Sequence, residues 1–115
     1  MPHYLFQASY TPESWAAMVR DPQDRSAAIR PLIEGLGGKL HEFFFAFGEN
    51  DVVLLAEAPD NVSVASLAIA IAAAGGVRSL KTTVLMPAGE AQEAMRRAAA
   101  IRYTAPGAKV PAGVS

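Results

Sequence analysis

The chain has 115 residues, which suffices for one ordinary domain and is too short for two independent hydrophobic cores. Half of the residues (51%) are hydrophobic and 18% are charged, and this balance excludes intrinsic disorder over most of the length. The formal net charge is −1 with no basic block, which argues against nucleic-acid binding by phosphate neutralisation. Because the chain has no cysteine, disulfides, a thiolate nucleophile and Cys-ligated metals are excluded.

The sequence shows no secretory or membrane-spanning signal. Its start, Met1-Pro2-His3-Tyr4, lacks the basic and apolar regions of a signal peptide. The most apolar stretch, residues 62–76, is shorter than the roughly 20 residues that a helix needs to cross a bilayer. We therefore expect a soluble cytoplasmic domain with neither nucleic acid nor membrane as a partner.

The first third of the chain predicts a strand followed by two helical stretches. Residues 3–10 are aromatic-rich and typical of a strand, and Thr11-Pro12-Glu13 is a typical helix start. Asp21-Pro22 interrupts this helix, because proline lacks the N–H that a helix interior needs. Asp21 is expected to cap the second stretch, which ends at Gly37-Gly38 and which Pro31 should kink.

The remainder predicts a hairpin, a helix, a strand and a last helix. The hairpin strands are residues 40–47 and 52–58, and Gly48-Glu49-Asn50-Asp51 supplies the turn. The later elements are expected at residues 62–74 (a helix capped by Asp60 or Asn61), 77–86 (a strand) and 88–101 (a helix). Residues 103–115 are rich in Pro, Gly and Ala and predict an extended tail.

This element order, β-α-β-β-α-β with a terminal helix, is typical of the α+β ferredoxin-like fold. We expect a four-stranded antiparallel sheet in the order 4-1-3-2, with both main helices on one face. The expected domain spans residues 1–102, followed by the tail.

The hairpin and its flanks resemble a known family. Leu36-Gly-Gly-Lys-Leu40, the aromatic run after it, Gly48-Glu-Asn-Asp51, Val-Val-Leu-Leu and Glu57-Ala-Pro-Asp60 are similar in order to the GYD domain family. Asn50 stands where the family's name-giving triplet has tyrosine. The resemblance covers about residues 1–95 and implies a dimeric α+β barrel, in small bacterial proteins of unassigned activity. It implies no catalytic residues. Related barrels include cofactor-free monooxygenases and small-molecule-binding domains.

One face of the predicted sheet is expected to be apolar although no helix covers it. Val53, Leu55 and Glu57 share one side of their strand, and an unpaired carboxylate beneath helices would be costly, so this side should face away from them. Leu5 joins the same face. The facing of residues 40–47 stays ambiguous, since both sides of that strand are largely apolar. An apolar face of this size marks an interface or a pocket, and we expect a second copy to cover it in a homodimer or a higher closed oligomer.

The side chains of this face, with the hairpin phenylalanines, are the candidate binding site for a small apolar ligand. The candidates are His3, Gln7, His41, Phe43, Phe45, Glu57 and Lys81. Simpler roles are an ion pair between Glu57 and Lys81 and a solvated or hydrogen-bonded His41. His3, His41 and Glu57 would form a two-histidine, one-carboxylate metal set, but each lies on a different strand and no local spacing supports it. The sequence therefore predicts neither metal nor cofactor.

Two functions of different class agree with these residues. The preferred one is an oligomeric domain that binds a small ligand without catalysis. The alternative is a cofactor-independent monooxygenase-like or isomerase-like enzyme of the dimeric α+β barrel type, with catalytic residues unknown. It requires an acid–base pair beside the aromatic cluster, and only Glu57 with a histidine qualifies. Asp51 is expected to accept hydrogen bonds from backbone N–H groups rather than to act in catalysis.

Overall fold

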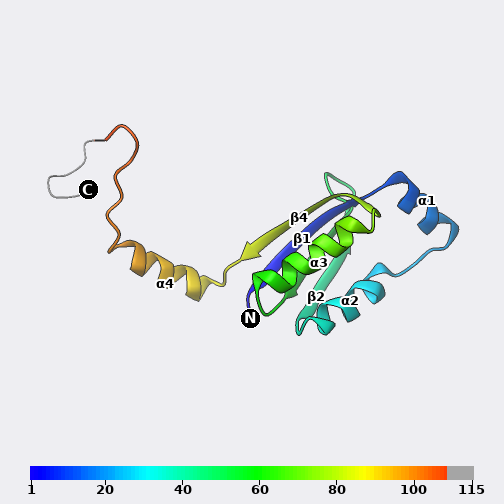
Figure 1. Cartoon of the computed structure of the whole chain (residues 1–115), viewed down its shortest axis with the longest axis horizontal. Helices are drawn as coiled ribbons and strands as arrows, with labels where there is room; N and C mark the ends of the chain where they lie inside the picture. The colour runs from blue at the N-terminus through cyan, green and yellow to red at the C-terminus, as the bar shows by residue number, and fades with distance from the viewer. Residues whose placement is uncertain (109–115) are drawn as a thin grey trace. The chain divides into compact units, whose positions relative to one another are not determined.

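A computed structural model describes residues 1–108 of the chain (Figure 1). The chain divides into two compact units, residues 1–85 and residues 86–115.

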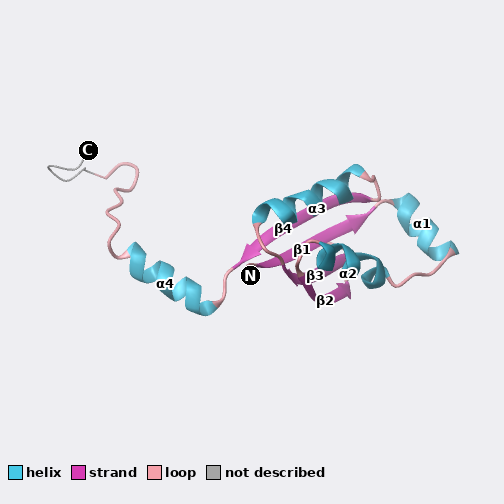
Figure 2. Cartoon of the chain, turned by 60° about the horizontal axis from the view of Figure 1, so that its bottom comes forward, coloured by secondary structure: helices cyan, strands magenta, loops and turns pink. Residues whose placement is uncertain are grey.

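The first unit is an antiparallel sheet of four strands with helices on one face (Figure 2). Its elements are β1 (His3–Tyr10), α1 (Pro12–Arg20), α2 (Arg25–Gly35), β2 (Lys39–Phe45), β3 (Val52–Glu57), α3 (Asn61–Ala73) and β4 (Val77–Leu85). The strand order is β2-β3-β1-β4, so the predicted topology is confirmed. The α+β, ferredoxin-like fold class predicted from the element order is likewise confirmed.

The core lies between the sheet and helices α2 and α3. Tyr4 and Phe6 of β1 are 1% and 3% exposed, and they contact residues of both helices in one apolar cluster. Ile33 of α2 and Leu67 of α3 belong to that cluster, which places the two helices on the same face. The Tyr4 hydroxyl donates a hydrogen bond of 2.7 Å to the side chain of Asn61, so the phenol keeps a polar partner in the core.

Side-chain caps fix where the helices begin. The Thr11 hydroxyl accepts from the Ser14 N–H at the start of α1, as predicted, and Asp60 accepts from the Ser63 N–H at the start of α3. The prediction for α2 was wrong, because Asp24 and not Asp21 caps it, accepting from the Ser26 N–H. Pro22 and the two residues after it are not helical, so the next carboxylate along the chain, Asp24, caps the helix. Helix α2 runs through Pro31 without ending there.

The second unit contains α4 (Ala88–Ala98), which is shorter than the predicted residues 88–101 and buries none of its side chains. This helix lies in the second unit. Its small and charged residues offer little apolar surface for packing. Residues 103–108 form neither helix nor strand. The rest of the predicted tail, residues 109–115, lies outside the described residues.

Across the described residues, no helix combines the length and the hydropathy that a membrane span requires.

Candidate functional site

Strand β2 contains a β-bulge that decides which of its side chains face the helices. Leu40 pairs with Ala56 and Glu42 pairs with Leu55, so His41 is an extra residue between the two pairs. The Arg30 guanidinium of α2 donates a hydrogen bond of 3.2 Å to the carbonyl of Leu40, directly before the bulge. The extra residue lets His41 and Glu42 both lie on the helix-free side.

The bulge turns Phe43 and Phe45 toward the helices. Phe43 packs against the core cluster, and the Phe45 ring lies 6.5 Å from that of Tyr10 and 6.2 Å from that of Trp15 between centroids. Phe44 is 60% exposed on the helix-free face. The sequence analysis grouped Phe43 and Phe45 with His3 and Glu57, and this grouping is corrected. One inserted residue inverts the facing of every residue after it, which alternation alone does not reveal.

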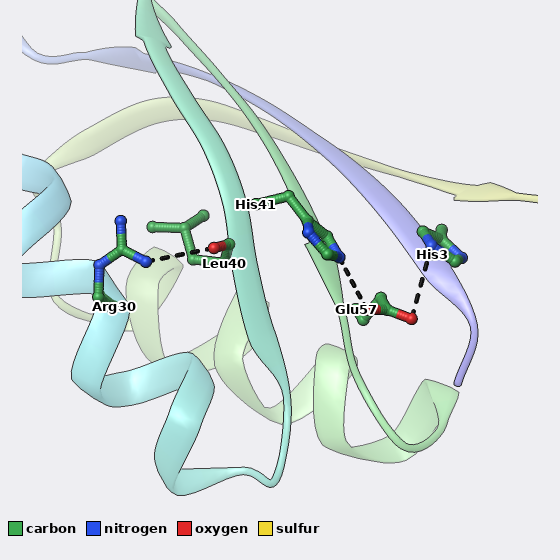
Figure 3. A network of polar contacts seen from close by, with 5 residues as sticks. All are labelled: His3, Arg30, Leu40, His41 and Glu57. Atoms are coloured by element: carbon green, nitrogen blue, oxygen red, sulfur yellow. Dashed lines mark hydrogen bonds and ion pairs between the residues drawn. The ribbon is translucent and has the colours of Figure 1, made fainter.

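Three of the predicted site residues do come together on the helix-free face, at one end of the sheet (Figure 3). His41 Nε2 lies 2.7 Å from Glu57 Oε2, and His3 Nε2 lies 3.5 Å from Glu57 Oε1. His3 pairs directly with Glu57 across β1 and β3, and the two imidazole rings are nearly parallel, with centroids 5.9 Å apart. The hydrogen bond from His41 is the main cause that lowers the pKa of the Glu57 carboxyl. We call these three residues the His-His-Glu cluster.

Gln7 and Lys81 lie on the same face but away from this cluster. They pair with each other across β1 and β4, four residues along β1 from His3 and therefore about 13 Å from it. Both line a polar hollow beside Glu49 and Arg78. Among the described residues no ion pair joins Glu57 to Lys81, because Glu57 pairs with His3 and Lys81 pairs with Gln7, four residues further along β1.

A larger, apolar cavity lies on the helix side of the sheet, between the strands and helices α1, α2 and α3. Its volume is about 460 Å³. Large apolar side chains from strands and helices line it, among them Phe6, Leu54, Leu67, Ile71 and Leu80. Ala8, Ala17 and Ala70 also line it, and side chains this small leave space that longer ones would fill.

The sequence analysis missed this cavity. The signal for it was the run of alanines in α3 opposite Ala8 of β1, although only the fold shows that they face one another.

Polar groups gather where α1 and α2 approach the cavity. Tyr10, Ser14, Gln23 and Arg25 contribute to its lining, and no Asp or Glu does. Burial raises the pKa of the Tyr10 phenol, and the nearby Arg25 guanidinium opposes this rise. Arg25 also donates a hydrogen bond of 3.0 Å to the side chain of Gln23. The cavity thus combines an apolar body with one cationic group.

Comparison with known proteins identifies the family of this chain. The family model of the GYD domain matches residues 4–95. The chain belongs to the GYD domain family. The crystal structure of MtbAldR is similar over 75% of this chain, with 15% sequence identity and a TM-score of 0.49. The match covers 53% of MtbAldR, so this chain spans about half the length of that protein. The search of curated proteins gave no match.

In this member of the GYD domain family, Asp51 joins the hairpin turn to β1 and α1. Its Oδ2 accepts hydrogen bonds from the Tyr10 N–H at 2.9 Å and from the Trp15 indole N–H at 3.1 Å. The prediction that the Asp51 side chain accepts a hydrogen bond from a backbone N–H is confirmed. The N–H belongs to Tyr10 of β1 and not to the turn. Asp51 is therefore a positioning residue that fixes α1 beside the cavity.

Proposed function

We propose that this GYD domain protein binds a small apolar molecule with an acidic group, in the cavity between the sheet and its helices. The observation that carries the proposal is the cavity itself. Its volume of about 460 Å³ and its mainly apolar lining are typical of a pocket for a small organic ligand. The sequence analysis expected an apolar cavity on the helix-free face instead, which only a second copy could close.

The charge of the lining supports an anionic ligand. Arg25 is the one charged side chain that the described residues contribute to the cavity, and its guanidinium is suited to bidentate hydrogen bonding with a carboxylate. The Tyr10 hydroxyl and Ser14 are further hydrogen-bonding groups of the same lining. A ligand with its chain among the apolar residues and its carboxylate at Arg25 matches both parts.

The separation of the two sites favours binding over catalysis. A cofactor-independent enzyme would need its acid–base pair beside the bound substrate. The His41–Glu57 pair lies on the helix-free face, and the sheet stands between it and the apolar cavity. We therefore prefer the binding function.

Calorimetric titration with decanoate tests this function. We expect the wild-type protein to bind decanoate and Ala70→Leu, which adds bulk to the cavity wall, to weaken binding about tenfold or more. Ala72→Leu is the matched control, because it adds the same side chain to α3 outside the lining. Absence of binding by the wild type, or equal loss in both variants, would contradict the proposal.

The acidic group is tested separately with Arg25→Met, which keeps an apolar stem and removes the charge. We expect the preference for decanoate over decanol to fall about tenfold, since a charge-assisted hydrogen bond contributes roughly 1.5–3 kcal/mol. Arg20→Met on α1 removes a cation that does not line the cavity and should leave the preference unchanged. Equal preferences in wild type and Arg25→Met would show that the ligand's acid binds elsewhere.

The helix-free face supports a second part of the proposal, a closed homo-oligomer in which two sheets pack together. Leu5, Val53 and Leu55 lie on this face with the exposed Phe44, opposite to the face that α2 and α3 of the first unit cover. Treated as a flat rectangle, a sheet of four strands of this length has an area of roughly 500 Å². A standard interface buries roughly 800 Å² per partner, so this face supplies a substantial part of one. The occupant that we propose is a second copy, related by a two-fold axis.

Leu55→Asp should dissociate this oligomer. An unpaired charge buried between two sheets costs several kcal/mol, so we expect the association constant to fall by about two orders of magnitude or more. Sedimentation at micromolar concentration measures the change. Ile69→Asp, at an exposed apolar position on α3, is the control and should leave association unchanged. A monomeric wild type would refute this part of the proposal.

A further inference from the structure

We propose that His3, His41 and Glu57 bind a divalent transition-metal ion of the Zn²⁺ class on the helix-free face. This site is separate from the apolar cavity, so the proposal goes beyond the ligand-binding function, and it lies on the face where two copies are proposed to pack. It rests on four observations: the spacing of the donor atoms, the strands that hold them, the incomplete hydrogen bonding of His3, and the access from solvent.

The donor atoms are close enough to share one ion. One donor atom from each of the three residues lies within 4.8 Å of the others. In a tetrahedral zinc site with bonds of 2.0–2.1 Å, neighbouring donors stand about 3.4 Å apart. His3 Nε2 and Glu57 Oε1 are already 3.5 Å apart, and His41 Nε2 and Glu57 Oε2, at 2.7 Å, need to separate by less than an ångström. Small side-chain rotations therefore suffice.

Three neighbouring strands hold the three side chains. β2, β3 and β1 lie next to one another in the sheet and supply His41, Glu57 and His3 in that order. His41 is the extra residue of the bulge in β2 and lies on the same face as Glu57, and Arg30 bonds to the backbone directly before it. As Figure 3 shows, the carboxylate stands between the two imidazoles. A metal site requires ligands that are held in place by rigid elements, and paired strands hold these three side chains in this way.

His3 is not held in this position by ordinary hydrogen bonds. Its Nε2, the nitrogen nearer the carboxylate, is 3.5 Å from Glu57 Oε1, beyond a normal N–H···O distance. A simple ion pair explains His41 but leaves His3 unexplained. Coordination of one ion by both imidazoles would give His3 a bonding partner and explain why its ring turns toward Glu57.

The chemistry and the access agree with a transition metal. Two imidazoles and a carboxylate are a typical donor set for Zn²⁺ and for Fe²⁺, and they leave at least one coordination position for water or a ligand. In the single chain the side chains of His3, His41 and Glu57 are 33%, 30% and 22% exposed, so an ion can reach the cluster before two sheets pack together. Calcium and magnesium are disfavoured, because both prefer all-oxygen ligands.

The test is a titration of protein free of any histidine tag with Zn²⁺ by calorimetry, and with Co²⁺ by visible absorption. We expect one ion per chain and, for Co²⁺, the intense bands of a four-coordinate site. Glu57→Gln and His41→Ala should each weaken Zn²⁺ binding about tenfold or more. Loss of a residue that only hydrogen-bonds to a metal ligand already lowers metal affinity roughly 10–100-fold, and these two residues would be ligands themselves. Glu42→Gln is the matched control. It removes a carboxylate next to His41 on β2 and on the same face of the sheet, but Glu42 is not part of the cluster.

Two results would overturn the proposal. One is the absence of stoichiometric binding by the wild type, and the other is binding by Glu57→Gln and His41→Ala as tight as by Glu42→Gln. If a variant fails to fold, imidazole ¹⁵N spectra of the wild type decide the question. Zn²⁺ should then shift the ring nitrogens of both His3 and His41, and unchanged spectra would refute the site.

Discussion

Gly38→Ala is expected to destabilise the protein by about 3 kcal/mol, near the upper end of the usual overpacking cost. A Cβ at position 38 would press on the carbonyl oxygen of Glu57 and would lie 3.1 Å from the Ile33 Cγ2. The carbonyl belongs to a paired strand and Ile33 is 2% exposed, so neither can move aside at low cost. The backbone of β3 would have to shift at the residue that carries the His-His-Glu carboxylate. Urea unfolding measures the loss.

Gly35→Ala is the matched control. It lies at the end of α2, where an added Cβ meets nothing within 4 Å. We expect this substitution to leave stability unchanged or to raise it by less than about 1 kcal/mol, because alanine is the better helix former. Equal stabilities of the Gly35→Ala and Gly38→Ala proteins would contradict the close approach of Gly38 to β3.

Asp51→Ala is expected to destabilise the protein by a similar amount, about 3 kcal/mol, and to loosen α1. The change removes the acceptor of two hydrogen bonds. A hydrogen bond to a charged group contributes roughly 1.5–3 kcal/mol to stability, and two bonds to the same acceptor contribute less than the sum of both. It also leaves the Tyr10 N–H without this partner. Trp15 is the only tryptophan of the chain, so its fluorescence reports on α1 directly. We expect its emission to shift to longer wavelength in the folded variant.

Glu49→Ala, in the same turn, controls for the loss of a carboxylate. Within residues 1–108 the Glu49 side chain makes no hydrogen bond. Its backbone carbonyl accepts one from the Ser9 hydroxyl, and the substitution keeps that carbonyl. Stability and emission should stay as in the wild type. An Asp51→Ala protein with unchanged emission and unchanged unfolding would show that Asp51 does not position α1.

The fold was predictable because its signals are local. Helix caps such as Thr11 and Asp60, the Gly48–Asp51 turn and the alternation in β3 define the elements, and their order leaves few topologies. The cap of α2 was misplaced by three residues, since Asp21 and Asp24 are equally good caps by residue type. Only the local backbone decides between them.

The candidate site was predictable only in part. Alternation placed His3, Leu55 and Glu57 on one face correctly, because β1 and β3 pair without irregularity. It left the facing of residues 40–47 open, and the irregular pairing at His41, which has no clear sequence signal, is what turns Phe43 and Phe45 toward the helices. His41 is the extra residue of this bulge and lies on the face of Glu57, so the third member of the His-His-Glu cluster comes from the strand whose facing the sequence left open.

The apolar cavity lay beyond sequence reasoning for a different reason. Periodicity shows which side chains face the core, but it does not show whether they fill the space between sheet and helices. Ala8 and Ala70 face the cavity from opposite walls, and the gap between them depends on how far α3 stands from β1. That distance is set by packing over the whole unit.

The most direct test of the proposed function is which face of the sheet responds to ligand, measured by methyl NMR during titration with decanoate. If decanoate binds in the cavity, we expect chemical-shift changes for the methyl groups of Leu67, Ile71 and Leu80, which line it. We expect unchanged signals for Leu5, Val53 and Leu55 on the helix-free face, whose oligomer contacts the ligand does not touch. The reverse pattern, with shifts confined to Leu5, Val53 and Leu55, would contradict the proposed function.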